Sequence, residues 1–395
     1  MKWLSDHKWV ALGFMVSAAY LPGIQGSFVP RWAVIAVGVP LVSQIDPRRV
    51  PTWMLVILGF IFCIASLSII HSPWPMAGIG ELIFMLLLSL TFISTAAMVS
   101  LDDVMIGLAA GLSLSTALSV AQWLGWSPVV TGSTSPSGLF YNSEVLGEFS
   151  ALIAAWFIAK FMDDRSVQSA ALAVMALVPT FLSHSRIGIF VVAVALIVAW
   201  GPKWKVLLSV VGVALIGGCA AVIFTKLGES VHRITLWGTT IMSMSFRGNG
   251  LGWASAAFPF EEFSHSDMLQ AVAELGFGAL ALLYIPFAAF RGTRGCRAEY
   301  ALFAAVLVEV AVSFPLHFPA TGFVSAVVAG YLVGLGPVLC GIAPASYPRH
   351  EPRSFWRGDA SDADAFRSKQ VGSVVSVRSV STESASVRGQ AAGAV

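Results

Sequence analysis

Long runs of apolar residues, separated by short groups of glycine, proline and charged residues, fill the first 341 positions of the chain. Runs such as 189–199 are apolar at consecutive positions, whereas the strands of a transmembrane barrel alternate apolar and polar residues. A bilayer leaves only helices as the alternative, because every backbone polar group must be bonded within the chain. The pattern predicts twelve helical spans, at residues 8–22, 28–44, 52–70, 80–100, 103–124, 142–161, 167–183, 187–201, 205–224, 267–290, 298–314 and 319–340.

Composition agrees with this pattern. Of 395 residues, 57% are hydrophobic and 11% are charged, whereas an ordinary soluble protein is about 25% charged. So few charges cannot cover a water-exposed surface of this size, which excludes a soluble enzyme, a disordered protein and a nucleic-acid-binding protein. The sequence therefore predicts an all-α, polytopic transmembrane bundle of about twelve helices, with membrane lipid as its surroundings.

Positive charges predict the orientation, because cytoplasmic loops are enriched in lysine and arginine. With twelve spans both termini share one side, and that side carries Lys2, Lys8, Arg48, Arg49, Arg165, Lys203, Lys205, Arg291, Arg294 and Arg297. The opposite side carries Arg31, Arg186, Lys226, Arg233 and Arg247. Both termini are therefore expected in the cytoplasm. Positive charge on the outer side opposes this bias and therefore suggests a function, although Arg31, next to Trp32, is more simply interpreted as an interfacial anchor.

The segments between the spans differ in length. The longest outer loop is expected at 225–266, and a second, rich in Ser, Thr, Pro and Gly, at 125–141. Long loops are frequently functional, so a working site is expected on the outer face. The chain is thus divided into a transmembrane bundle (1–341) and a disordered cytoplasmic tail (342–395), whose last part is rich in Ser, Val and Ala and lacks aromatic residues.

Two outer arginines are the strongest candidates for chemistry. Arg186 stands in the apolar context FLSHSRIGIF and Arg233 in VHRITLW; an arginine at such a depth is expected to be paired, water-exposed or functional. The guanidinium group matches phosphate oxygens in a planar, paired geometry. Gly188 and the neighbouring serines are expected to leave room for a polar ligand beside Arg186. The alternatives are a snorkelling side chain for Arg186 and an exposed loop charge for Arg233, and Arg247 is a weaker third candidate.

His265 begins the sequence HSDMLQAVAELGFGAL, where the long outer loop meets the tenth span. An imidazole with a pKa near neutrality can take a proton from a sugar hydroxyl. The alternative is that His265 is simply a polar residue at the membrane interface. Neither the histidines nor the four cysteines have metal-ligand spacing, so no metal or other cofactor is expected. The GNGLG segment lacks the strand–loop–helix context of a nucleotide site, and no GxSxG segment supports serine hydrolysis.

Four stretches, in order, resemble motifs of the O-antigen ligase and O-antigen polymerase superfamily. They are SGLFYNSEVLGEFSALIAAW (137–156), LSHSRIGIF (182–190), HRITLWGTT with GNGLGW (232–253) and HSDMLQAVAELGFGAL (265–280). The last helix of the family is resembled more loosely by a closing segment, FPLHFPATGFVSAVVAGYLVG (314–334). The resemblance covers about residues 137–335.

This resemblance implies a bundle in the style of the C-type glycosyltransferases, in the bacterial inner membrane. It implies transfer of a glycan from an undecaprenyl-diphosphate carrier to an acceptor sugar or lipid A-core on the outer face, with no metal. By motif match, Arg186 and Arg233 would bind the diphosphate and His265 would activate the acceptor hydroxyl or act otherwise at the transfer step. The sequence departs from the family where Ser266 follows the histidine.

Further side chains could line a glycan-binding groove. Asn142, Glu144 and Glu148 begin the sixth span, where they could instead favour the positive end of the helix dipole. Trp237 and Trp253 could stack on sugars or belong to an aromatic belt. A secondary transporter or a flippase of lipid-linked sugars is the main alternative function, and it would need charge near the midplane on discontinuous helices, which the sequence does not indicate. The acceptor, the sugar and any protein partner stay open.

Overall fold

The computed structural model describes residues 7–20, 28–43, 50–96, 98, 101–127, 135–200, 227–258, 266–292, 297–313 and 315–339. Within these ranges all regular structure is helical, which confirms the all-α prediction. The predicted ninth span (205–224) and the predicted tail (342–395) lie outside the described residues.

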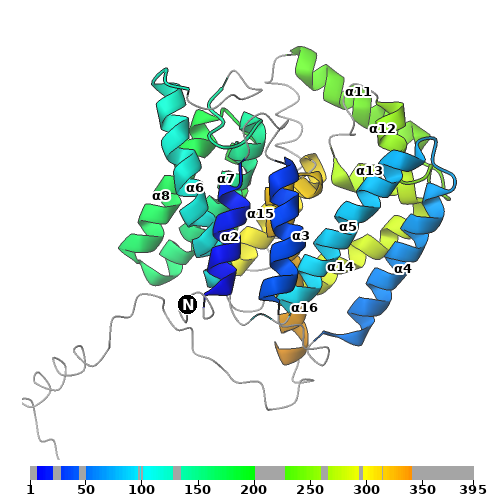
Figure 1. The fold of residues 1–395 in the computed structure, drawn as a ribbon, viewed down its shortest axis with the longest axis horizontal. Coiled ribbons are helices and arrows are strands. Elements are labelled where there is room, and N and C mark those ends of the chain that lie inside the picture. The colour runs from blue at the N-terminus through cyan, green and yellow to red at the C-terminus, as the bar shows by residue number, and fades with distance from the viewer. Residues whose placement is uncertain are drawn as a thin grey trace, which may run out of the picture. The chain divides into compact units, whose positions relative to one another are not determined.

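Helices occupy the other predicted ranges, and further short elements lie in the predicted outer loop (Figure 1). The elements are α2 (Lys8–Ala18), α3 (Phe28–Val42), α4 (Thr52–Ile69), α5 (Pro75–Ala96), α6 (Asp102–Trp123), α7 (Ser143–Asp164), α8 (Val167–Leu182), α9 (Arg186–Trp200), α11 (Leu227–Ser243), α12 (Trp253–Ala257), α13 (Asp267–Leu275), η1 (Gly276–Ala279), α14 (Leu280–Gly292), α15 (Arg297–Val312), η2 (Pro315–His317) and α16 (Pro319–Leu339).

Five helical segments among the described residues are long and apolar enough to cross a membrane. They are α4, α5, α6, α7 and the run Asp267–Phe290, which combines α13, η1 and most of α14. Five more apolar helices are shorter, namely α2, α3, α8, α9 and α16. For α16 this refers to Pro319–Leu335. The length and composition of these helices favour a membrane protein.

Contacts between helices show which of their ends lie together. The hydroxyls of Ser150, in the second turn of α7, and Thr180, near the end of α8, lie 2.8 Å apart. Ser313, just after α15, donates to the carboxylate of Glu148 on α7 at 3.0 Å. The backbone N–H of Asp267, the first residue of α13, donates to the Ser313 carbonyl at 3.0 Å. We call this end of the bundle, defined by Glu148, Thr180, Asp267 and Ser313, the α11 end.

The opposite end is marked by ion pairs. Lys160, near the end of α7, contacts Asp102 at the start of α6 at 2.8 Å. Arg297, at the start of α15, contacts Asp163 at 3.4 Å. Successive helices therefore run in alternating directions between the two ends, as consecutive membrane spans would.

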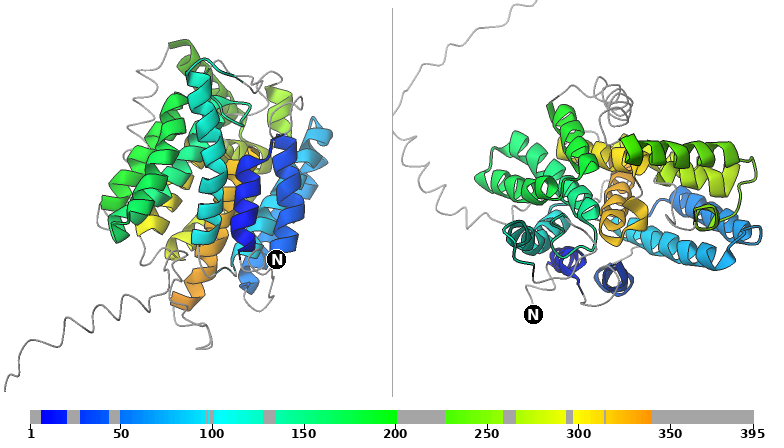
Figure 2. Two further views of the ribbon diagram at one scale, coloured as in Figure 1. Left: turned by 60° about the vertical axis from the view of Figure 1, so that its left-hand side comes forward. Right: turned by 90° about the horizontal axis from the view of Figure 1, so that it is seen from above.

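Helix α11 has a different orientation from α2 and α3. Seen from above (Figure 2, right), α2 and α3 are viewed end-on, whereas α11 is seen along its length. It packs against α13, and Leu236 on α11 joins Ala254 and Phe258 in a small apolar core at this end. The predicted outer loop thus contains an amphipathic helix that lies across the α11 end.

Helix α7 is the centre of the bundle. Its side chains from Ser143 to Phe157 are buried except for that of Glu144, and it contacts α8, α9 and α15. A helix that is apolar on all sides is expected to be surrounded by others. Burial of α7 matters for the site because it carries Glu148 into the protein interior.

Glycines let α2 and α6 approach closely. A Cβ atom added to Gly13 on α2 would meet the Val104 carbonyl oxygen at 2.6 Å, and one added to Gly107 on α6 would meet the Val10 backbone. Membrane helices have little hydrophobic driving force between them, so small residues that permit backbone contact stabilise such pairs.

Arg31 is not the interfacial anchor that the sequence suggested. Its guanidinium is fully buried and lies 3.9 Å from the ring centroid of Phe140. Its Nε donates to the carbonyl of Val16 at 2.9 Å and its Nη2 to that of Ser17 at 3.1 Å. These carbonyls lie at the end of α2, so Arg31 caps that helix from α3.

Replacing Gly13 with alanine should therefore destabilise the protein, because the new methyl group has no space against α6. Overpacking of this kind costs about 1–3 kcal/mol. The matched control is Gly59→Ala on α4, where an added Cβ meets no atom within 4 Å. Thermal unfolding of the detergent-solubilised variants should show a lowered Tm for Gly13→Ala alone; equal Tm values would contradict this packing.

Candidate functional site

Segments far apart in the sequence meet at the α11 end, and five of them are the stretches identified above. Gly147 of 137–156 contacts Ser185 and Gly188 of 182–190. Residues 248–252 contact Glu274 and Gly78. His317 of 314–334 contacts Asp267 of 265–280. Ser313 joins the first two stretches to the other three, because its hydroxyl donates to Glu148 and its carbonyl accepts the N–H of Asp267.

Arg186 is the first residue of α9, and its side chain is exposed. Ser185 fixes this helix start, because its hydroxyl accepts the N–H of Gly188 at 3.1 Å. The preceding His184 adopts a left-handed backbone conformation, φ 55°. A sharp turn between α8 and α9 thus presents the guanidinium at the α11 end.

Gly188 and the neighbouring serines do not leave room for a ligand, contrary to expectation. A Cβ atom at Gly188 would lie 2.6 Å from the carbonyl oxygen of Gly147, and one at Gly147 would meet the side chains of Ser183 and Ser185. The small residues permit contact between α7 and α9. Their packing fixes the position of Arg186 relative to α7, and any ligand would approach Arg186 from its exposed side.

Asn142 and Glu144 are exposed at the start of α7, at the same end. The Asn142 side chain accepts the N–H of Glu144 at 2.8 Å, so Asn142 is the N-cap of α7. Glu144 lies in the first helical turn, where its charge favours the positive end of the helix dipole. Both residues thus have a structural role, whether or not they also bind a glycan.

The remaining predicted residues are described to different extents. Arg233 belongs to α11, but its side chain lies outside the described part, and His265 lies outside it altogether. Trp237 is half-buried on α11, and Arg247 is exposed in the turn that follows this helix. The meeting of Arg186, Arg233 and His265 in one site therefore stays a prediction.

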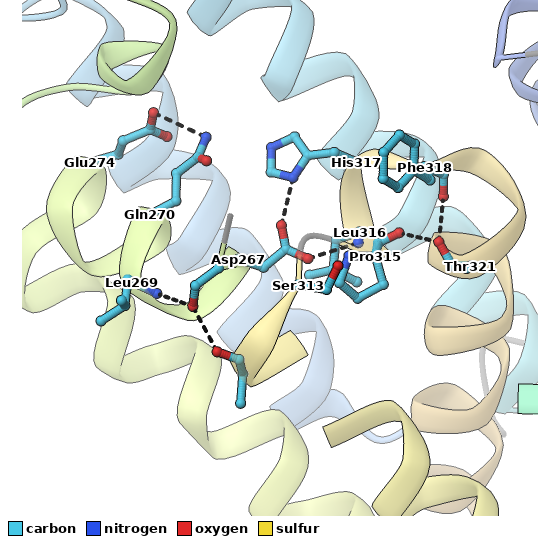
Figure 3. Close-up of polar contacts among 12 residues, drawn as sticks. Asp267, Leu269, Gln270, Glu274, Ser313, Pro315, Leu316, His317, Phe318 and Thr321 are labelled. Carbon is cyan, nitrogen blue, oxygen red and sulfur yellow. Dashed lines mark hydrogen bonds and ion pairs between the residues drawn. The ribbon is translucent and has the colours of Figure 1, made fainter. Parts of the chain in front are cut away.

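Asp267, which is buried, and His317, which is half-buried, form a hydrogen-bonded pair that sequence reasoning missed (Figure 3). The Nδ1 atom of His317 lies 2.6 Å from Oδ1 of Asp267. The other carboxylate oxygen accepts the N–H of Leu316 at 2.8 Å. Ser266 caps α13 by accepting the N–H of Leu269, and its hydroxyl donates to the Ala311 carbonyl at 3.0 Å. The start of α13 is thereby fixed to the turn between α15 and α16.

Burial alone would lower the pKa of His317, but the Asp267 carboxylate, its hydrogen bond and the charge of Glu81 outweigh this effect, so the pKa is raised. A raised pKa in the folded protein means that the pair stabilises the fold fully at pH values below the ordinary histidine value. That stabilisation is lost as the pH rises through the folded-state pKa of His317.

Further carboxylates are buried nearby. Glu148 is held by the Ser313 hydroxyl, at 3.0 and 3.1 Å from its two oxygens. Glu309 on α15 is fully buried, and neither of its carboxylate oxygens has a hydrogen-bond partner among the described residues. Glu148 and Asp267 are its charged neighbours. Sequence reasoning overlooked Glu309, although a glutamate inside an apolar run is itself a signal of function.

Glycines bring the GNGLG segment against α13. The N–H groups of Asn249 and Gly250 donate to the carbonyls of Ala273 and Glu274, at 2.9 and 3.0 Å. A Cβ atom at Gly248, where φ is 76°, would meet the Glu274 carbonyl. The loop therefore caps the end of α13, and the following Gly276, with φ 56°, starts a short 3₁₀ turn. The tenth predicted span is consequently broken.

Glu274 lies at this break and is buried. Its Oε1 accepts the N–H of Ala254 at 3.0 Å and the amide of Gln270 at 3.4 Å (Figure 3). Glu274 thus ties α13 to α12.

The sequence matches no protein-family model, and no curated protein matches it significantly. The resemblance to the O-antigen ligase and polymerase superfamily therefore rests on its motifs alone.

Asn142→Ala should lower the stability of the protein by about 0.5–2 kcal/mol, because the N–H of Glu144 loses its acceptor. Asn142→Asp keeps a capping oxygen and should retain wild-type stability. Thermal unfolding of both variants in detergent measures the difference. Equal losses in the two variants would be inconsistent with a capping role.

Proposed function

We propose that this protein is a membrane glycosyltransferase of the O-antigen ligase or polymerase type. It moves a glycan from undecaprenyl diphosphate to an acceptor hydroxyl on the outer face of the bacterial inner membrane. The observation that carries the proposal is the contact, at one end of the bundle, between motif stretches that are distant in sequence.

The proposed topology has twelve spans with both termini in the cytoplasm, so the α11 end faces outward. The alternating direction of the described helices supports it, as does the exposure of Arg186 and Arg247 at that end. Arg165, in the turn that joins α7 to α8, belongs to the opposite end, where the sequence predicts a cytoplasmic loop.

In the proposed mechanism Arg186 and Arg233 bind the carrier diphosphate and stabilise its negative charge as it leaves. Such preorganised electrostatic stabilisation is usually the largest single contribution to catalysis. The lipid tail extends between helices into the bilayer. His265 acts at the transfer step, and the incoming hydroxyl attacks from the side opposite the diphosphate, with inversion. Arg247, Asn142, Glu144 and Trp237 contribute to glycan binding. The acceptor is lipid A-core for a ligase or another glycan unit for a polymerase.

A secondary transporter or flippase of lipid-linked sugars is the second candidate. One observation favours it: the helix break at Gly276 next to the buried Glu274, because transporters bind substrates at discontinuous helices. Proteoliposomes supplied with lipid-linked glycan separate the two functions. New glycosidic bonds indicate transfer, whereas movement across the bilayer without bond formation indicates transport.

Arg186→Ala should reduce glycan transfer by about 100-fold or more, because one donor to the leaving group is lost. The matched control is Arg297→Ala, since Arg297 is a partly exposed arginine at the opposite end, and it should keep wild-type activity. Transfer is scored on glycan gels after complementation of a deletion strain, with membrane insertion checked by immunoblot. Full activity of Arg186→Ala would reject this arginine as a diphosphate ligand.

The glycan profile of the deletion strain identifies the acceptor. Loss of all long chains from lipid A indicates ligation, and lipid A capped with single units indicates polymerisation.

A further inference from the structure

Glu309 is a buried acid in an otherwise apolar stretch of helix. It lies in the last turn of α15, and its side chain is fully buried. Neither of its carboxylate oxygens has a hydrogen-bond partner among the described residues. The carboxylates of Glu148 and Asp267, in contrast, accept hydrogen bonds from Ser313 and Leu316. An ionised carboxylate that is buried without donors is so costly that such a group takes up a proton instead.

The charges around Glu309 make its ionisation still less favourable. Its charged neighbours are Glu148 on α7 and Asp267 on α13, and both are acids. Asp267 is hydrogen-bonded to His317 of η2, which also packs against α15. The other elements that pack against α15 are α9 and α16. The one charged residue of α9 is Arg186, whose side chain is exposed, and the sequence of α16 contains none. The surroundings of Glu309 therefore favour the neutral acid.

We propose that Glu309 is a proton-binding site, and that its proton keeps α7, α13 and α15 together at the α11 end. Ser313 lies one helical turn after Glu309, and its N–H donates to the Glu309 carbonyl at 2.7 Å. Ser313 also bonds the side chain of Glu148 and the backbone of Asp267. Negative charge on Glu309 would repel both acids at this junction, whereas a neutral Glu309 lets the three helices pack. The site needs no glycan substrate, so it is independent of the function proposed above.

Folding then takes up one proton at Glu309 near pH 7. A glutamate of the unfolded chain is ionised at this pH, whereas Glu309 of the folded protein carries its proton. Stability falls with rising pH wherever the folded state binds more protons than the unfolded state. The fall ends when the folded protein loses the proton as well. High pH is therefore expected to weaken the contact between α7, α13 and α15.

Infrared spectroscopy tests the site directly, because a protonated carboxylic acid has a C=O stretch that an ionised carboxylate lacks. The experiment uses the full-length protein at pH 7 in an alkyl maltoside detergent, which has no carbonyl group. Glu309→Gln should lose the acid band of one carboxyl group. The matched control is Glu144→Gln, since Glu144 is an exposed glutamate at the same end, and it should keep the wild-type band. A folded Glu309→Gln variant with the full wild-type acid band overturns the proposal.

Thermal unfolding from pH 5 to 8 gives a second measurement. Glutamine has the shape of a neutral glutamic acid but cannot ionise, so Glu309→Gln should have the higher Tm, and its advantage should grow by about 2 °C or more over this range. The raised pKa of His317 gives both proteins a common fall with pH, so only the difference between them reports on Glu309. A difference that stays constant with pH contradicts proton binding at Glu309.

Wild-type protein decides if Glu309→Gln does not fold. Glutamate labelled with ¹³C at its side-chain carboxyl shifts the C=O stretch of glutamic acid and leaves that of aspartic acid in place. A shifted acid band at pH 7 supports the proposal, and its absence from the folded wild-type protein overturns it.

Discussion

The carboxylate of Asp267 determines how the α11 end is assembled. A buried charge is costly unless donors surround it, and here these donors come from the turn between α15 and α16. The backbone of Asp267 also donates to Ser313, whose hydroxyl holds Glu148 on α7. One buried acid thereby links α13, α15, η2 and the central helix. The carboxylate bonds η2, and the backbone N–H of the same residue reaches Ser313 and so the central helix.

Glycines provide the second constraint on how the helices pack. Because they have no side chain, the backbone of one segment can lie directly against the backbone of another. At Gly188 and Gly147 the contact fixes the start of α9 against α7. At Gly248 the contact lets a loop cap α13, so the helix ends after Leu275 and continues as a 3₁₀ turn. Short motifs such as GNGLG therefore act here through packing.

The positions of most helices could be predicted from sequence, because apolar runs bounded by charge and proline report membrane spans directly. The break at Gly276 could not, since glycine is common inside membrane helices and only the loop at 248–252 makes this one a terminus. The surroundings of Arg31 and Gly188 were misjudged for a related reason. Periodicity shows that a residue lies on a helix, but tertiary packing decides which neighbour it meets.

The distribution of charge favours transfer over transport. The described arginines of the candidate site, Arg186 and Arg247, are exposed at the α11 end, whereas Glu148, Asp267 and Glu309 are buried behind it. A diphosphate needs accessible cations. Buried acids close to the surface would repel it unless their charge is directed at another group, as that of Asp267 is at His317. Glu274 fits this arrangement, since its bond to Ala254 assigns it to the α11 end. A transport route would require such charges at the middle of the bilayer.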